Sequence, residues 1–183
     1  MANNKKRKNY GSNNSSGTAR PITVKEKKKQ LIKERIHSDP VKSRGMRALG
    51  IIVSAILLSR IALFIYELAY YAYLGLSVGV ISNLLLLPLL LILFMAHDGN
   101  RGLLAVSAVS AVVRIIYLFS STYPALEGLS GSGVFVAAYA VIMAAQFIMS
   151  VTALSMPSTD AYSKEMQKIN YELRSSLMNG TRR

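Results

Sequence analysis

The chain has 183 residues, of which 51% are hydrophobic, yet its formal net charge is +13. These two properties are segregated, because residues 1–47 carry 14 of the 22 lysines and arginines and residues 48–155 carry three. This segregation excludes a uniformly polar soluble domain, and the lack of cysteine excludes disulfides, thiolate metal sites and cysteine nucleophiles.

The first 47 residues divide into two basic segments. Residues 1–21 are rich in Asn, Ser, Gly and basic side chains without apolar periodicity, so we expect a disordered basic tail. Residues 22–47 begin with an amphipathic pattern and are predicted to form a basic juxtamembrane segment on anionic inner-leaflet lipids. The side chains expected at that surface are Lys25, Lys27, Lys28, Lys29, Lys33 and Arg35. Nucleic acid is the alternative partner, but no aromatic stacking platform accompanies the charge, so lipid is expected instead.

Four apolar segments are long enough to cross a hydrocarbon core, which takes about 20 helical residues. They cover residues 48–71, 78–96, 102–122 and 133–155, and turn-forming residues separate them. Backbone groups in lipid must pair within the chain, so each segment is predicted to be a helix. The expected fold is an all-α integral membrane protein with a four-transmembrane-helix bundle at residues 48–155.

The placement of Lys and Arg predicts the orientation. Basic residues occur before the first span, in the middle loop as Arg101, and after residue 156, whereas the other two loops have none. Positive loops stay inside, so both termini and the middle loop are expected in the cytoplasm, and the protein in the cytoplasmic membrane.

Residues 156–183 are predicted to form a cytoplasmic amphipathic helix followed by a short tail. Apolar side chains recur there at three- and four-residue spacing, namely Tyr162, Met166, Ile169, Leu173 and Leu177. The apolar stripe could dock on the protein's own bundle, lie on the membrane, or bind a partner helix.

Three ionisable side chains lie within the predicted spans. Arg60 and Glu67 are seven residues apart and share a face of the first span, and Arg114 lies in the third. Both arginines lie ~18 Å from the cytoplasmic side, just past the middle of a ~30 Å core. Further polar side chains line one face of the third and fourth spans: Ser107, Ser110, Ser121, Tyr139, Gln146 and Ser150. These stripes are expected to face each other in a polar seam, because unpaired polar groups are costly in lipid.

The predicted seam contains two arginines and one glutamate, so its charges do not cancel. Three interpretations remain open: packing satisfied by carbonyls, hydroxyls and trapped water; contact with an acid on another membrane subunit or a second copy; or binding of an anionic solute. The candidate residues for binding or partner contact are Arg60, Glu67, Arg114, Tyr117, Tyr139 and Gln146.

No catalytic pattern accompanies these charges. His37 and His97 each stand alone, and the glycines of residues 128–133 lack dinucleotide-binding spacing. We therefore expect no enzyme, no cofactor and no metal site. The expected function is an accessory or scaffolding subunit of a membrane complex, in transport or envelope machinery. The alternative is a small transporter or channel whose arginine-lined seam handles an anionic solute.

Overall fold

The computed structural model describes residues 23–75 and 86–180, and the regular structure within these two ranges is entirely helical. Its elements are α1 (Val24–Ile32), η1 (Lys33–His37), α2 (Pro40–Tyr73), α4 (Leu86–His97), α5 (Leu103–Tyr117), η2 (Leu118–Thr122), α6 (Tyr123–Leu126), α7 (Ser132–Ser155) and α8 (Pro157–Gly180). Three helical stretches are long and apolar enough to cross a membrane: Pro40–Tyr73, Leu103–Leu126 and Ser132–Ser155. The prediction of an all-α fold with several helices able to span a membrane is confirmed for the described residues, which supply three such helices.

The predicted second span is described only in its second half, as α4. The 12 residues of α4 rise about 18 Å, which is less than a ~30 Å hydrocarbon core. Residues 78–85, which we predicted to begin this span, lie outside the described residues. The predicted disordered tail at 1–21 and residues 181–183 also lie outside them.

The predicted juxtamembrane segment and the first span share one helix, because α2 begins at residue 40 and runs to Tyr73. Asp39 caps this helix: its carboxylate accepts from the backbone N–H of Val41 at 2.9 Å and of Lys42 at 3.4 Å. Pro40 occupies the first helical position, where a missing N–H leaves no hydrogen bond unmade. The cap at Asp39 and Pro40 therefore sets the start of α2, and the apolar run continues the same helix.

The short helix α1 has its own start signal. The Thr23 hydroxyl accepts from the backbone N–H of Glu26 at 3.3 Å, and the Glu26 carboxylate accepts from the Thr23 backbone N–H at 2.9 Å. This reciprocal pair is a capping box, which satisfies two otherwise unpaired N–H groups.

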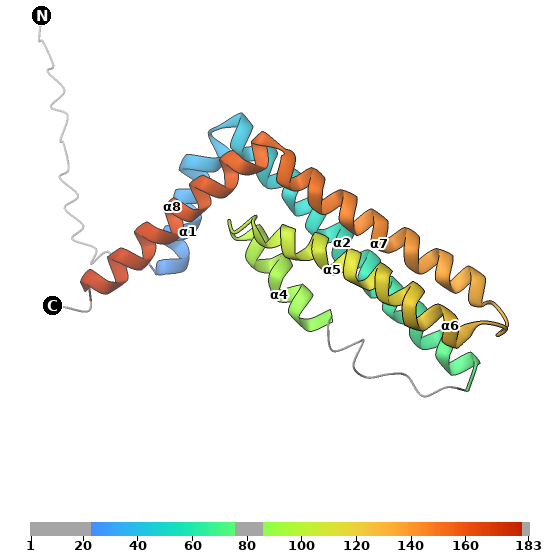
Figure 1. The fold of residues 1–183 in the computed structure, drawn as a ribbon. Helices are drawn as coiled ribbons and strands as arrows, with labels where there is room; N and C mark the ends of the chain where they lie inside the picture. Colours follow the sequence, from blue (N-terminus) through green and yellow to red (C-terminus); the bar gives the residue numbers. More distant parts are fainter. Residues whose placement is uncertain (1–22, 76–85, 181–183) are drawn as a thin grey trace, which may run out of the picture.

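Segments from the two ends of the described chain form an arm (Figure 1). The arm comprises residues 24–47 and 157–180, with α8 antiparallel to α1 and to the start of α2. Four residues of the predicted α8 stripe are buried, namely Tyr162, Met166, Ile169 and Leu173, whereas Leu177 is 51% exposed. Of the three alternatives for the C-terminal stripe, docking on the protein's own bundle is the nearest to the structure, but α8 packs mainly on α1, on α2 and on the turn that follows α4.

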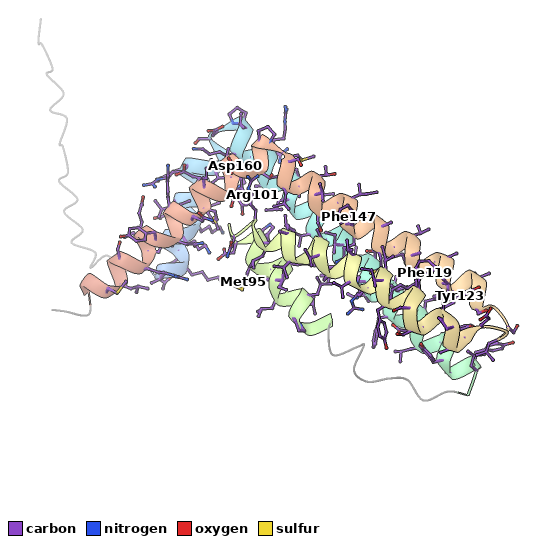
Figure 2. All side chains as sticks on the ribbon, viewed as in Figure 1. Met95, Arg101, Phe119, Tyr123, Phe147 and Asp160 are labelled. Atoms are coloured by element: carbon purple, nitrogen blue, oxygen red, sulfur yellow. The ribbon has the colours of Figure 1, made fainter. Side chains whose placement is uncertain are left out.

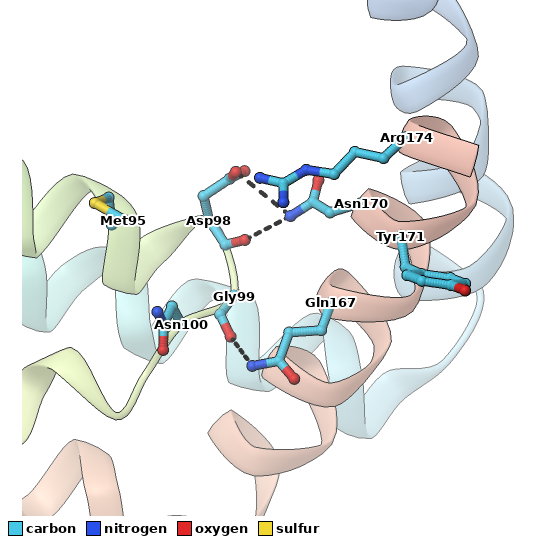
Figure 3. A pocket seen from close by; sticks show the side chains of 8 residues that line it. All are labelled: Met95, Asp98, Gly99, Asn100, Gln167, Asn170, Tyr171 and Arg174. Atoms are coloured by element: carbon cyan, nitrogen blue, oxygen red, sulfur yellow. Dashed lines mark hydrogen bonds between the residues drawn. The ribbon is translucent and has the colours of Figure 1, made fainter. Parts of the chain in front are cut away.

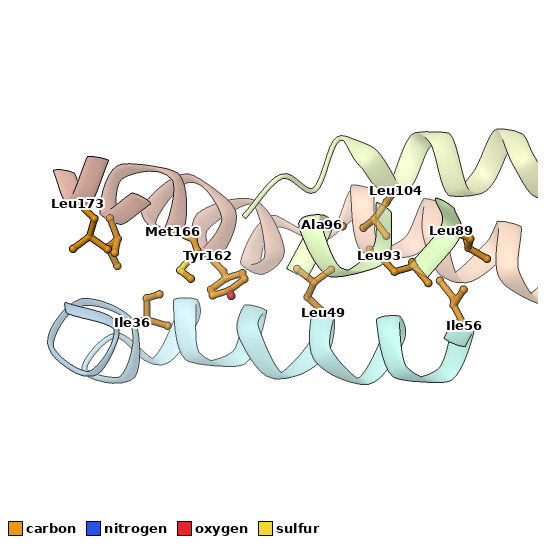
Figure 4. Close-up of a cluster of buried hydrophobic side chains, with 12 residues drawn as sticks. Ile36, Leu49, Ile56, Leu89, Leu93, Ala96, Leu104, Tyr162, Met166 and Leu173 are labelled. Carbon is orange, nitrogen blue, oxygen red and sulfur yellow. The ribbon is translucent and has the colours of Figure 1, made fainter. Parts of the chain in front are cut away.

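One apolar core runs from the arm into the bundle (Figure 4). In it Ile36 and Tyr162 of the arm join Leu49, Leu93 and Leu104 of the bundle. A second core fills the opposite end of the bundle, where the rings of Tyr70 and Phe135 stack with centroids 4.6 Å apart. The outer faces carry large exposed apolar side chains, as a lipid-facing surface does: Ile51, Leu58, Phe94, Val109, Ile116 and Ile148.

Candidate functional site

The polar seam lies where α2, α5 and α7 pack together. α7 contributes Tyr139, Gln146 and Ser150, which are all buried although they are polar. Their four- and seven-residue spacing places them on one helical face, and that face meets α5 at Ser107. The predicted contact between the polar stripes of residues 102–122 and 133–155 is observed here, between α5 and α7.

The Gln146 amide is the centre of one layer of the seam. Its Nε2 donates to the backbone oxygen of Ser107 at 3.0 Å, to the Ser107 hydroxyl at 3.1 Å and to the Ser110 hydroxyl at 3.3 Å. Ser150 donates to the same Ser107 hydroxyl at 3.2 Å. Among the described residues no group donates to the buried Gln146 Oε1, so this layer retains one free acceptor.

Arg60 occupies the next layer, inside the bundle. Its exposed fraction is only 5%, and its Nη1 lies 2.9 Å from the sulfur of Met143, a weak acceptor. The buried Arg60 Nε has no hydrogen-bond partner among the described residues. A guanidinium with an unused donor therefore lies next to an amide layer with an unused acceptor.

The remaining predicted site residues surround Arg60. Arg114, half-buried on α5, donates from Nη1 to the Tyr139 hydroxyl at 3.3 Å. Arg114, Tyr139 and Glu67 are all within electrostatic reach of Arg60. Tyr117 lies at the rim with 61% of its surface exposed. The structure thus brings the two arginines and the glutamate together, as the sequence predicted, with Gln146 adjoining them along α7.

The chemistry of this site is that of hydrogen bonding and charge. The guanidinium groups, hydroxyls and amide present donors into a bundle interior where an unpaired polar group is costly. Within residues 23–75 and 86–180 no three His, Asp or Glu side chains lie close enough together to hold a metal ion. The arrangement suits binding of water, a small anion or an acidic group.

The six basic side chains predicted at the membrane surface divide into two groups. Lys25, Lys27, Lys29 and Lys33 are exposed. By contrast, Lys28 Nζ lies 2.6 Å from Asp98 and Arg35 Nη1 lies 2.7 Å from Glu172. These two side chains tie α1 and η1 to the rest of the protein through partners far away in the sequence.

The turn between α4 and α5 is a feature that the sequence pattern did not single out. Its carbonyl oxygens accept hydrogen bonds from α8: Tyr162 donates to His97 at 2.8 Å, Asn170 to Asp98 at 2.9 Å, and Ser163 to Gly99. Gly99 has a φ of 109°, in the left-handed region that favours glycine.

An ion pair completes this junction between the arm and the bundle (Figure 2). Arg101 Nη2 lies 2.8 Å from Asp160, and its Nη1 donates to the Leu154 carbonyl at 3.1 Å. In the sequence Arg101 indicated only the orientation, and its structural partners lie more than fifty residues away in the chain.

No family model, curated protein or solved structure matches this chain. Its function is therefore inferred from the geometry of the seam and the arm.

Proposed function

We propose that the protein is a non-catalytic multi-pass membrane protein that acts as an accessory or scaffolding subunit of a membrane complex, in transport or envelope machinery. The observation that carries this proposal is the fixed junction between the arm and the bundle. Arg101 bonds α8 and the end of α7 at once, while Tyr162 and Asn170 hold the turn from the other side. Because the arm is fixed to the bundle, a partner protein bound to the arm would be held at a defined position relative to the membrane-spanning helices.

The far end of the arm offers a contact surface. Val24 at the start of α1 is 43% exposed and Met178 near the end of α8 is 66% exposed, although both are apolar. Exposed lysines of α1 surround this end with positive charge. A protein partner with an acidic rim around an apolar contact would complement it.

Native mass spectrometry of the tagged protein, extracted gently from its own membrane, tests the scaffolding role. We expect a second polypeptide at fixed stoichiometry, and loss of that polypeptide when Val24→Asp and Met178→Asp are combined. The matched control combines Val24→Ile and Met178→Leu, which keeps the surface apolar. A chain recovered alone, or a partner unaffected by the aspartates, would contradict the role assigned to the arm.

Membrane topology belongs to the same proposal: four spans in the cytoplasmic membrane with both termini in the cytoplasm. In support, α2 begins in the arm and α8 lies in it, so the chain leaves the arm side and returns to it. An even number of crossings is then required. In the proposed arrangement, α2, α5 with α6, and α7 make three crossings, because they are the candidate spans among the described residues, and the predicted segment 78–96 makes the fourth.

The natural lack of cysteine makes this topology directly measurable. A single Lys168→Cys in the arm and a single Ser130→Cys in the α6–α7 turn are labelled in intact cells with a membrane-impermeant maleimide. Ser130→Cys is expected to react at once and Lys168→Cys only after permeabilisation. Reaction of both on the same side would rule out the proposed arrangement.

A second candidate function, anionic solute transport, is favoured by the burial of Arg60. An acid on another subunit would have to enter the bundle to reach its free Nε, because the side chain is only 5% exposed. A small anion or a water molecule can enter where a subunit cannot. The Gln146 amide and Tyr139 hydroxyl would supply further polar contacts to such a solute.

Neutralising Arg114 separates the two functions. In the scaffolding role, if an acid of the partner subunit also reaches Arg114, which is half-buried and thus more accessible than Arg60, Arg114→Gln should release the partner while the isolated protein stays folded. In the transport role it should abolish thermal stabilisation by chloride, phosphate or succinate and leave assembly intact. Unfolding of the variant would show that the arginine serves packing alone.

Arg60→Met gives an independent check of the transport role. Replacing a buried ion by an apolar side chain of similar length is often neutral or stabilising. We expect Arg60→Met to keep its melting temperature in detergent and to lose anion-induced stabilisation. Stabilisation that persists in this variant would exclude the arginine as the anion site.

A further inference from the structure

The α4–α5 turn and α8 enclose a pocket with a volume of about 420 Å³, separate from the polar seam (Figure 3). The pocket lies at the end of the bundle where α4 ends and α5 begins. In the proposed topology, on which this inference rests, that level is the cytoplasmic membrane interface. Its lining includes Met95, Asp98, Asn100, Asn170, Tyr171 and Arg174. This volume falls in the range of sites that hold small organic ligands.

The α8 wall of the pocket carries a free positive charge. Arg174 makes no hydrogen bond or ion pair with any residue in the described part of the chain, and Figure 3 shows it reaching back toward Asp98 and Asn170. The Asp98 carboxylate is already neutralised, because Lys28 Nζ lies 2.6 Å from it. The site therefore has one net positive charge, carried by a guanidinium whose planar donors match a phosphate group.

The α4 wall of the pocket is apolar and continues toward the membrane. Met95 is 45% exposed, the adjacent Phe94 is 74% exposed, and Leu91, one turn earlier, is 62% exposed. Residues three and four apart share a helical face, so these side chains form an exposed apolar strip that leads to the pocket. A positive charge next to an apolar strip matches the layout of a phospholipid, in which a charged phosphate group adjoins an apolar acyl chain.

We propose that this pocket is a specific phospholipid site. Arg174 binds the phosphate diester, the Asn100 and Asn170 amides bind hydroxyls of the headgroup, and one acyl chain lies along Leu91, Phe94 and Met95. The single net positive charge selects an anionic lipid such as phosphatidylglycerol over a zwitterionic one. This site, between α8 and the α4–α5 turn, is distinct from the general attraction of anionic lipids by the exposed lysines of α1.

Native mass spectrometry of the full chain tests the site. The protein is taken from vesicles of phosphatidylcholine with a minor fraction of phosphatidylglycerol and stripped stepwise with detergent. We expect the wild type to retain one phosphatidylglycerol, and Arg174→Gln to weaken its retention about tenfold, the effect of one charge-assisted contact. Lys168→Gln, which removes one charge from a different face of the same helix, is expected to retain the lipid.

Two further measurements make the outcome decisive. Phe94→Ala should weaken lipid retention without any change in charge, because it shortens the apolar strip. Inorganic phosphate and glycerol 3-phosphate, added to the detergent-solubilised protein, should not raise its melting temperature, since neither has an acyl chain. Equal loss of lipid from Arg174→Gln and Lys168→Gln would reduce the site to diffuse attraction. Stabilisation by free phosphate, with retention unaffected by Phe94→Ala, would assign the pocket to a soluble anion and overturn the proposal.

Discussion

Tyr162 joins the arm to the bundle through one buried hydroxyl. Its side chain is 1% exposed, and the hydroxyl donates to the His97 carbonyl at 2.8 Å. Burial, with a smaller effect from the nearby charge of Asp98, raises the pKa of Tyr162 to about 12, because a phenolate would lose its hydration there. The neutral, donating form is thus strongly favoured in the folded protein.

Removing this hydroxyl should loosen the junction. We expect Tyr162→Phe to lower the free energy of unfolding by about 1–3 kcal/mol, because the His97 carbonyl then loses its buried donor. Tyr171→Phe on the same helix is the control, since that side chain is 74% exposed. Thermal unfolding in detergent measures both. Equal stability of the two variants would show that water replaces the lost donor.

The same residue predicts an alkaline transition. The folded pKa of Tyr162, about 12, is above its ordinary value of 10.0, so its contribution to stability is complete below pH 10. That contribution is lost as the pH rises from 10 through 12. The free energy of unfolding of the wild type should therefore fall between pH 10 and 12. Tyr162→Phe, which has no phenol at this position, should show a smaller fall. Melting temperatures of the two proteins, compared across the window, test this.

Within the seam, the Gln146 amide nitrogen donates to three oxygens of α5. Its amide holds Ser107 and Ser110 of α5, and hydrogen bonds within membrane bundles are worth about 0.6 kcal/mol on average and up to about 1.7. Gln146→Leu should thus destabilise the α5–α7 contact by about 1 kcal/mol, measured by reversible unfolding in mixed micelles. A gain in stability would mean that the unpaired Oε1 costs more than the donors contribute.

The seam was predictable because helical spacing is fixed by geometry. The helical period alone is enough to place Ser107, Gln146 and Ser150 on polar faces of their helices. The contact of Arg60 with Met143 was not predictable, because it depends on how far each helix is rotated about its axis. The ion pair of Lys28 with Asp98 was not predictable either, because seventy residues separate the two in the sequence.

At the level of elements, the crossing of α2 and α8 depends on a residue without a side chain. A Cβ atom placed on Gly45 would overlap the backbone carbonyl of Ser158, whereas one placed on Gly50 would make ordinary contact with the His97 ring, with Nε2 nearest at 3.6 Å. Both glycines lie in α2, where alanine is otherwise the better helix former. Gly45 therefore sets how closely the two helices approach.

Gly45→Ala should separate α2 from α8 and destabilise the arm by about 1–3 kcal/mol, as overpacking does. Gly50→Ala is the matched control and should be neutral or slightly stabilising. Limited proteolysis of the arm and thermal unfolding give the comparison. If both variants behave alike, the close approach at Gly45 does not hold the arm.

The limits of helices were less predictable than their existence. Apolar runs identify the spans, yet α2 begins at residue 40 because Asp39 and Pro40 supply a cap, ahead of the apolar run. The TVKE sequence from Thr23 to Glu26 carries a readable capping box. The docking of α8 remained one of three alternatives, because an apolar stripe alone does not state which surface covers it.

For the molecule as a whole, ion pairs make the stability of the arm dependent on pH in the acidic range. A hydrogen bond from Arg35 lowers the pKa of Glu172, and a hydrogen bond from Lys164, with the charge of Arg101, lowers the pKa of Asp160. Both folded values lie below the ordinary 4.5 and 3.8. Their contribution is therefore present above those values and is lost as the pH falls through the folded ones.

Mild acid should loosen the arm before it affects the bundle. Hydrogen exchange of α1 and α8 in nanodiscs is expected to accelerate below about pH 4.5, while α5 and α7 remain protected. The effect should be modest, because these pairs are partly exposed. Glu172→Gln with Asp160→Asn should exchange faster at neutral pH and respond less to acid. Uniform acceleration of all helices would place the acid response elsewhere.

The antiparallel arm also imposes an order on biosynthesis. α1 and the start of α2 are synthesised first among the described helices, whereas α8, which covers Ile36 and Leu49 together with the turn at Gly99, is synthesised last. Every intervening helix must be synthesised before the N-terminal half of the arm can contact α8, so this contact has a large sequence separation. Until then the apolar side of that half has no α8 to cover it, and exposed apolar surface of this kind is what makes incompletely folded chains prone to aggregate.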